Sequence, residues 1–525
     1  MIKTFSFFKY FFYFFLLITF LKTFNIYPGN KSIYVLFSII SLFHLFYGLR
    51  KKSYFIDKFI AIFFWLGFWF KFSFEFAYSL WGEINFREGI GLFDKTPAGY
   101  DNVLLISSVG ITAFIFASFV NKLVFSNHEA SFKNTTNLFY NNNKKKIYLS
   151  FYLAVFLVSI TNIYFGIYQK GIIPNQDISI YISYLFRWLL LFGFTSFACI
   201  LLYFEIANQN INYKLIYLLF FESFFSNLSL LSRSVIFNFI SFIYGLFYYL
   251  GKIKLKKNKL IFGLILFSII LFFFNILSVN KIRDLKFYGK KKISKIYDIK
   301  KFAESEKEFE NFLVTNSSVN DLSNLYSKKI KDKINIFDLI SSSHYKTNFI
   351  TVNLFDIIYL LTNRWVGIDA VMSVYAQKDY LNFDLLKKSL NEKFEQYEYS
   401  FFEKNFLKRK DSISDKNLVN SNAVILPGLI AYLYFSGSKI FLFISIFIIV
   451  LGGQILEHLS YKLSKKNMIF TAFMGYILAS RLAHSGYLVS NNVNYLIALL
   501  INLFVVSLII IIFKKLDKSL IKEHK

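Results

Sequence analysis

Three arginines are expected on the outer side of the membrane or just beneath it: Arg233, in a short connection between two apolar segments, Arg364 and Arg481. An arginine that slips into the hydrocarbon of a bilayer costs roughly 2.5–3.5 kcal/mol on insertion scales, so these side chains are expected to face water or other protein. The planar, permanently charged fork of arginine suits bidentate binding of phosphate. If the three face one cavity, they form an anion clamp, with Asn363 and Trp365 as further ligand contacts. The alternative for each arginine is snorkelling at the interface or pairing with a carboxylate.

Two residues are candidates for a general base. Glu88 lies in the first sizeable outer loop and His484 follows Arg481 by three residues, and either group can take the proton of a hydroxyl. For Glu88 the alternative is an ordinary solvated loop acid. Inside apolar segments, Arg187 and Lys71 have to face the bundle interior, and each is a candidate for contact with the same anion. Structural pairing is the alternative, and for Lys71 the expected partner is Glu75, one helical turn away.

The signatures of several enzyme classes are missing from the sequence. It contains no glycine-rich phosphate loop, no H-E-x-x-H, no G-x-S-x-G and no pair of histidines at metal-ligand spacing. These absences argue against nucleotide hydrolysis, zinc hydrolysis and serine acyl transfer. The single cysteine, Cys199, lies in an apolar segment, so neither a disulfide framework nor a cysteine-based metal site is possible. We therefore expect no metal ion and no cofactor.

Composition places the chain in a membrane. Apolar residues make up 55% of the 525, aromatic residues 21%, and the mean hydropathy is +0.46. These values are far from those of a soluble protein. The formal charge is +28, but most Lys and Arg residues occupy short connections between apolar segments, where they hold one side of the helices in the cytoplasm. This distribution indicates a lipid bilayer as the partner and argues against nucleic acid.

Hydropathy over windows of about 19 residues predicts an all-α polytopic membrane protein with about twelve transmembrane helices. The predicted spans are 5–21, 32–49, 55–76, 102–123, 147–167, 179–206, 215–231, 235–250, 260–279, 439–456, 467–486 and 492–513. Basic clusters then fall on one face, which predicts that both termini are cytoplasmic. These clusters are Arg50–Lys52, Lys144–Lys146, Lys252–Lys259, Lys462–Lys466 and Lys514–Lys515.

The pattern divides the chain into three parts. An N-terminal transmembrane bundle of about nine spans covers residues 1–279. A large outer, periplasmic loop with amphipathic helices covers residues 280–423. A re-entrant segment and three further transmembrane helices cover residues 424–525.

Three smaller elements are predicted at the outer face. Apolar residues at helical spacing predict one helix over 348–376 and a second, amphipathic helix over 379–408. Residues 424–435 contain Pro427-Gly428 and are too short to cross ~30 Å of hydrocarbon at ~1.5 Å per residue. A re-entrant half-helix is therefore predicted there, covered by other protein or lining an aqueous cavity.

This layout and several short motifs resemble the bacterial O-antigen or oligosaccharide repeat-unit polymerases. The motifs are Asn363-Arg364-Trp365-Val366-Gly367, Pro427-Gly428 with the later Leu433-Tyr434-Phe435-Ser436-Gly437, Lys71 with Glu75, and Glu88-Gly89. The resemblance implies a glycosyltransferase that polymerises undecaprenyl-diphosphate-linked oligosaccharide repeat units into a surface polysaccharide, as in lipopolysaccharide biosynthesis. It places the reaction at the periplasmic face of the bacterial inner membrane, and it implies a chain-length regulator and a flippase as partners.

The candidate residues fit such a reaction on their own chemistry. The leaving group is a diphosphate, whose developing charge is stabilised by fixed cations such as Arg233, Arg364 and Arg481. Glu88 or His484 would take the proton of the acceptor hydroxyl. Three alternatives stay open: an O-antigen ligase, another lipid-phosphate-sugar glycosyltransferase, and a flippase or other transporter of lipid-linked glycans. The large outer loop and the lack of an evident internal repeat count against a transporter.

Overall fold

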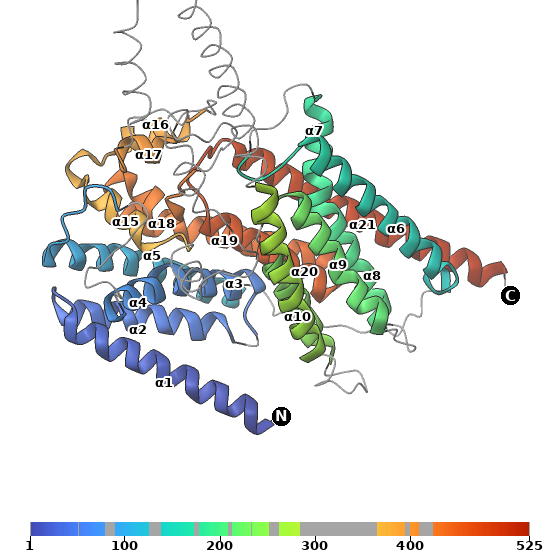
Figure 1. The fold of residues 1–525 in the computed structure, drawn as a ribbon, viewed down its shortest axis with the longest axis horizontal. Coiled ribbons are helices and arrows are strands. Elements are labelled where there is room, and N and C mark those ends of the chain that lie inside the picture. Colours follow the sequence, from blue (N-terminus) through green and yellow to red (C-terminus); the bar gives the residue numbers. More distant parts are fainter. Residues whose placement is uncertain are drawn as a thin grey trace, which may run out of the picture.

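The computed structural model describes the helical bundle and parts of the predicted outer loop (Figure 1). The described residues are 2–50, 52–78, 90–124, 138–172, 178–207, 213–232, 234–250, 262–283, 365–393, 399–408 and 424–523. Every regular element in these ranges is a helix, which confirms the all-α prediction. Residues 284–364 of the predicted loop lie outside the described ranges.

The helices follow the predicted apolar segments in order. The first part of the chain forms α1 (Ile2–Ile26), α2 (Lys31–Gly48), α3 (Phe55–Phe64), the π-helical turn η1 (Trp65–Phe70), α4 (Lys71–Ala77), α5 (Pro97–Val124) and α6 (Leu138–Phe165). Next come α7 (Ile180–Trp188), the π-helical turn η2 (Leu189–Gly193), α8 (Phe194–Ala207), α9 (Tyr213–Ser229), α10 (Val235–Leu250) and the helix Phe262–Arg283. The last part forms α19 (Lys439–Leu463), α20 (Met468–Ala483) and α21 (Asn491–Glu523).

Eight of the described helices are long and apolar enough to cross a membrane, which makes this a multi-pass membrane protein. Three shorter apolar helices, Tyr10–Ile26, Val235–Tyr249 and Met468–Ala483, coincide with further predicted spans. Each of the twelve predicted spans falls on a helix, but length and composition support eight crossings. The number twelve stays a prediction.

The core of the bundle lies around α20. Almost every residue of α20 is buried, because it packs against α3, α8, α10 and α19. By contrast, α6 and α21 bury little of their apolar surface and leave large side chains such as Leu149 and Phe504 exposed. Exposed apolar rows on long helices are expected where lipid replaces water as the solvent.

The predicted helix over 348–376 is wrong as a continuous element. Among the described residues it starts only at Ile368, as α15 (Ile368–Tyr375), and the chain from Trp365 to Gly367 is not helical. Gly367 lies directly against the backbone of Gly67 in η1, and a Cβ atom on either glycine would overlap the backbone opposite. The close approach of these two backbones replaces regular helix here.

The single helix predicted over 379–408 is also wrong. The structure has three short elements, η3 (Lys378–Tyr380), α16 (Phe383–Leu390) and α17 (Phe401–Asn405). Two side-chain caps start the last two helices: Asn382 accepts from the N–H of Leu385 at 2.8 Å, and Ser400 forms a capping box with Glu403. These caps favour new helix starts over continuation of one amphipathic helix.

The predicted half-helix corresponds to α18 (Gly428–Leu433) followed by the 3₁₀ turn η5 (Tyr434–Ser436). Gly428 and Gly437 bracket it, each with a positive φ that favours glycine, at 76° and 74°. Nine residues at ~1.5–2.0 Å each are too short to span ~30 Å. This segment is buried against α5, α15, α19 and α20, and Figure 1 shows it grouped with α15, α16 and α17 at one end of the bundle. We call that end the α18 end.

Candidate functional site

A cluster of four cations lies at the α18 end, and we call Lys170, Arg187, Arg283 and Arg481 the cation cluster. Each comes from a different helix end or connection. Arg283 ends the helix Phe262–Arg283, and its Nη2 donates to the carbonyl oxygens of Lys170 and Leu231 at 2.9 and 2.8 Å. The Lys170 ammonium donates to Ser232 Oγ at 3.2 Å. These bonds tie the connection after α6 to the turn between α9 and α10.

The two remaining cations of the cluster pack on tyrosines. The guanidinium of Arg187 lies 5.3 Å from the ring centre of Tyr168, and that of Arg481 lies 5.0 Å from the ring of Tyr495. Arg481 Nε also donates to Asn492 Oδ1 at 2.7 Å. Arg187 and Arg481 lie close enough for their charges to repel. Aromatic faces stabilise a cation without cancelling its net charge.

Lys170, Arg187 and Arg481 concentrate positive charge in this part of the protein. Within the described part of the chain, no carboxylate forms an ion pair with Lys170, Arg187 or Arg481. Burial, together with the charges of Arg283 and Arg187, lowers the pKa of Lys170 to about 8. A pKa depressed by neighbouring cations shows that these groups repel one another across a partly desolvated space. A bound anion would relieve that repulsion.

The connection after α6 is held rigidly by one buried asparagine. Asn162 Oδ1 accepts from the N–H of Tyr168 at 2.8 Å, and its Nδ2 donates to the carbonyl oxygens of Tyr168 and Ser229 at 2.9 and 3.0 Å. Because each bond satisfies a polar group that water cannot reach, the asparagine fixes the position of the loop. Tyr168, and with it Arg187, is therefore positioned before any ligand binds.

His484 lies beside the cation cluster in a form that can act as a base. Its Nδ1 is 2.8 Å from the carbonyl oxygen of Ser480, and because a carbonyl only accepts, Nδ1 carries the proton. The unprotonated Nε2 can then accept a proton from a hydroxyl. Burial lowers the pKa of His484, as do the charges of Lys170 and Arg481, although its bond to Ser480 opposes them. The imidazole is therefore neutral at pH 7.

Aromatic side chains connect His484 to the segment that follows Arg364. The ring of Phe63 lies 6.0 Å from His484 and 6.2 Å from Trp365, measured between centres. Trp365 also packs at 5.8 Å against Phe237, which stacks on Tyr476. The Trp365 segment, α3, α10 and α20 are thus packed together through these rings.

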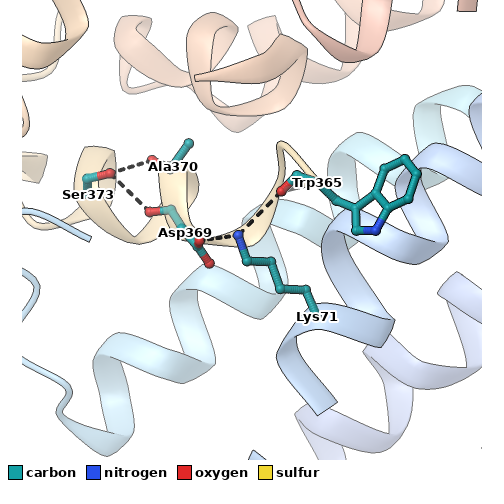
Figure 2. A network of polar contacts seen from close by, with 5 residues as sticks. All are labelled: Lys71, Trp365, Asp369, Ala370 and Ser373. Atoms are coloured by element: carbon teal, nitrogen blue, oxygen red, sulfur yellow. Dashed lines mark hydrogen bonds and ion pairs between the residues drawn. The ribbon is translucent and has the colours of Figure 1, made fainter. Parts of the chain in front are cut away.

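Lys71 is held within the protein by an ion pair with Asp369, in the first turn of α15 (Figure 2). Its ammonium also donates to the carbonyl oxygen of Trp365 at 3.3 Å. Ser373 Oγ donates to the carbonyls of Asp369 and Ala370 at 3.0 and 3.2 Å, which supports the same turn. Both charged side chains are buried. Lys71 therefore positions the segment just after Arg364, a role that the proposed pairing with Glu75 did not anticipate.

The structure brings several of the predicted site residues together and leaves others outside the described ranges. Arg187, Arg481 and His484 lie together. Trp365 lies on the segment before α15, and Lys71, on α4, contacts that segment. Glu88, Arg233, Asn363 and Arg364 fall outside the described residues. Their chain neighbours do not: Ser232 binds Lys170, and Gly91 packs against the backbone of Phe406.

Lys170 and Arg283 were missed from the sequence. Each follows the outer end of a predicted span whose basic cluster lies at the cytoplasmic end. A cation on the outer side, where few are expected, was therefore a signal in the sequence. Both look like ordinary loop cations until the fold shows that they share one space with Arg187.

The comparisons with known proteins were negative. No protein-family model, curated protein or solved structure matches this chain. Function is therefore argued from the geometry of the cation cluster, His484 and the Trp365 segment.

Proposed function

We propose that this protein is a glycosyltransferase that polymerises lipid-linked oligosaccharide repeat units, using the cation cluster to hold the diphosphate of an undecaprenyl-diphosphate donor. The observation that carries this proposal is the joint placement of a neutral histidine and three cations, Lys170, Arg187 and Arg481, that form no ion pair with a described carboxylate, at one end of a membrane bundle. A diphosphate is the ligand that such a cluster stabilises well, because its several charges meet several fixed donors. The membrane setting favours a diphosphate carried on a lipid.

The reaction follows from these groups. A hydroxyl oxygen of the acceptor glycan attacks the anomeric carbon of the donor, and the bond from that carbon to the diphosphate oxygen breaks. The electron pair leaves on the diphosphate, where Arg187, Arg481 and Lys170 stabilise the added charge. The hydroxyl proton goes to Nε2 of His484. No nucleotide is consumed, because the sugar–diphosphate bond supplies the energy.

The residues outside the described ranges extend this site. Arg364 precedes Trp365, which packs near His484, and Arg233 stands in the sequence between Ser232, which accepts from Lys170, and Ser234. Arg233 and Arg364, with Asn363, are assigned to the same diphosphate and glycan. Glu88 is the second candidate for the base. In this account the chain crosses the inner membrane twelve times, with the α18 end at the periplasmic face and both termini in the cytoplasm.

The surface glycan of a deletion strain tests the proposal. The gene is to be deleted in its host, and the strain is then complemented with a gene for the wild-type or a variant protein. The surface glycan of each strain is separated on a gel. We expect the deletion to leave cores that carry a single repeat, and Arg481→Ala to do the same at normal protein level. Arg50→Ala is the matched control, because Arg50 also packs on a tyrosine, Tyr47, but lies outside the cluster.

The other outcomes identify the alternatives. Bare cores with polymer left on the lipid carrier would mean a ligase, and loss of both polymer and single repeats would mean a flippase. Unchanged chain lengths in the deletion strain would contradict all three activities.

A further inference from the structure

A groove of about 580 Å³ lies between α6, the η2–α8 segment and α21, and none of the four cations of the cation cluster lines it. The volume is in the range of roughly 300–1,000 Å³ that is usual for ligand sites. These helices lie side by side in Figure 1. Its walls are mainly apolar, with Ile147, Phe151, Ala154, Phe194, Val506 and Ile509 among the lining residues. Three of these, Ile147, Ala154 and Ile509, are partly exposed, so the groove opens onto the surface of the bundle.

One end of the groove is basic, because Lys146 lines it. Asp517 Oδ1 of α21 accepts from the N–H groups of Leu138 and Phe139 at 2.6 and 3.3 Å, which joins the start of α6 to α21. Lys146 lines the groove just above this junction and is exposed. Lys144, two residues earlier, is neutralised by Glu205 at 2.5 Å.

Among the described residues, no carboxylate forms an ion pair with Lys146 or with its neighbour Lys145. A cation at the mouth of an apolar groove between membrane helices is complementary to a lipid with an anionic head group. A wholly apolar ligand would leave the charged end without a partner, and a wholly polar ligand would not match the apolar walls.

A buried polar atom in the wall indicates where the lipid changes from polar to apolar. Asn502 is buried and lines the groove; its Nδ2 donates to Ser196 Oγ at 2.8 Å, and its Oδ1 has no hydrogen-bond partner among the described residues. The pairing of Phe139 with Phe513 fixes the register of α6 against α21 and brings Lys146 near Val506, so Asn502 lies about one turn deeper. If the amide is rotated half a turn, Oδ1 accepts from Ser196 and Nδ2 can donate to an ester oxygen.

We propose that this groove binds an anionic glycerophospholipid from the leaflet at the Lys146 end, with the phosphate against Lys146, the ester region at Asn502 and one acyl chain along the apolar walls. No cation of the proposed catalytic cluster lines the groove, although Trp188, which follows Arg187, does. An anionic lipid held here would fasten α6 and α21, which expose much of their apolar surface, to the body of the bundle.

Native mass spectrometry of delipidated protein, titrated with phosphatidylglycerol or phosphatidylcholine, tests this proposal. We expect one phosphatidylglycerol to bind in preference to phosphatidylcholine, and Lys146→Gln to weaken it about fivefold. Ala154→Trp should abolish this binding by filling the groove. Leu149→Trp is the matched control, because Leu149 is on the same helix, 73% exposed and absent from the lining.

Equal affinity for the two lipids, or full binding by Ala154→Trp, would overturn the proposal. If Ala154→Trp does not fold, a phosphatidylglycerol with a photoreactive acyl chain replaces it, with the wild-type protein. Crosslinks concentrated on Phe151 and Val506 support the groove, and crosslinks spread evenly over lipid-facing helices such as α2 refute it.

Discussion

The ion pair between Lys71 and Asp369 is expected to determine both the stability of the bundle and the placement of the Trp365 segment. The two side chains are only 3% and 8% exposed, so removing one partner leaves the other charge buried without its ion pair. Loss of one member of a buried pair typically costs about 3–5 kcal/mol, whereas apolar replacement of both is often neutral. We therefore expect Asp369→Leu or Lys71→Met alone to destabilise the protein by about this amount, and the double variant to recover most of it.

The assay is a double-mutant cycle on protein in lipid nanodiscs, with unfolding followed by tryptophan fluorescence during denaturant titration. The two single variants and the double variant are compared with wild type under one lipid composition. If each single variant costs less than about 1 kcal/mol, or if the two costs simply add, the pair does not hold α15 in the way described. Activity of the double variant then reports separately on whether the charges are needed for more than stability.

Four further outcomes follow from the site and the fold. Arg481→Ala should reduce polymer synthesis by roughly 10²–10³ and Arg481→Lys should recover only part, because an ammonium cannot copy the planar fork; wild-type chain lengths in both would refute the clamp. Because the pKa of His484 is lowered in the folded protein, the stability that its neutral form contributes should be present at neutral pH and decline as the pH falls below the ordinary histidine pKa. Activity should decline at the still lower pKa of the folded protein, and His484→Gln should be slow at every pH. Gly367→Ala should destabilise the protein by about 1–3 kcal/mol through overlap with Gly67, whereas Gly452→Ala, with open space around it, should not. With Cys199 replaced by alanine, single cysteines can be introduced at exposed positions and treated with an impermeant thiol reagent in intact cells. Cysteines in place of Lys388 and Lys439, near the α18 end, should react, and cysteines in place of Lys145 and Lys465, at the opposite end, should not.

The positions of the helices could be predicted from hydropathy because each lipid-spanning segment must satisfy its own backbone hydrogen bonds. That requirement is local to the segment, so windows of apolar residues such as those of α5 and α19 identified the helices well. The short α18 was visible for the same reason, since Pro427-Gly428 and the length of the apolar run rule out a regular crossing.

The break at Trp365 could not be read from the sequence in the same way. It depends on contact between Gly367 and Gly67, which are far apart in the chain, and apolar spacing on its own continues through the break. The ion pair of Lys71 with Asp369 was missed for a related reason: the local pair with Glu75 is visible in the sequence, whereas Asp369 reaches Lys71 only through the fold. Lys170 and Arg283 join the cation cluster through such long-range packing as well.

Chain extension by the purified protein tests the central claim most directly. The protein in nanodiscs is to be given undecaprenyl-diphosphate-linked repeat units without added nucleotide, and both glycan length and released undecaprenyl diphosphate are to be measured. The account predicts that the wild type and the Arg50→Ala control form chains at similar rates, and that Arg187→Ala with Arg481→Ala is at least about 10²-fold slower. Chain formation by the double variant at the wild-type rate, or a folded wild type that releases no diphosphate carrier, would contradict it.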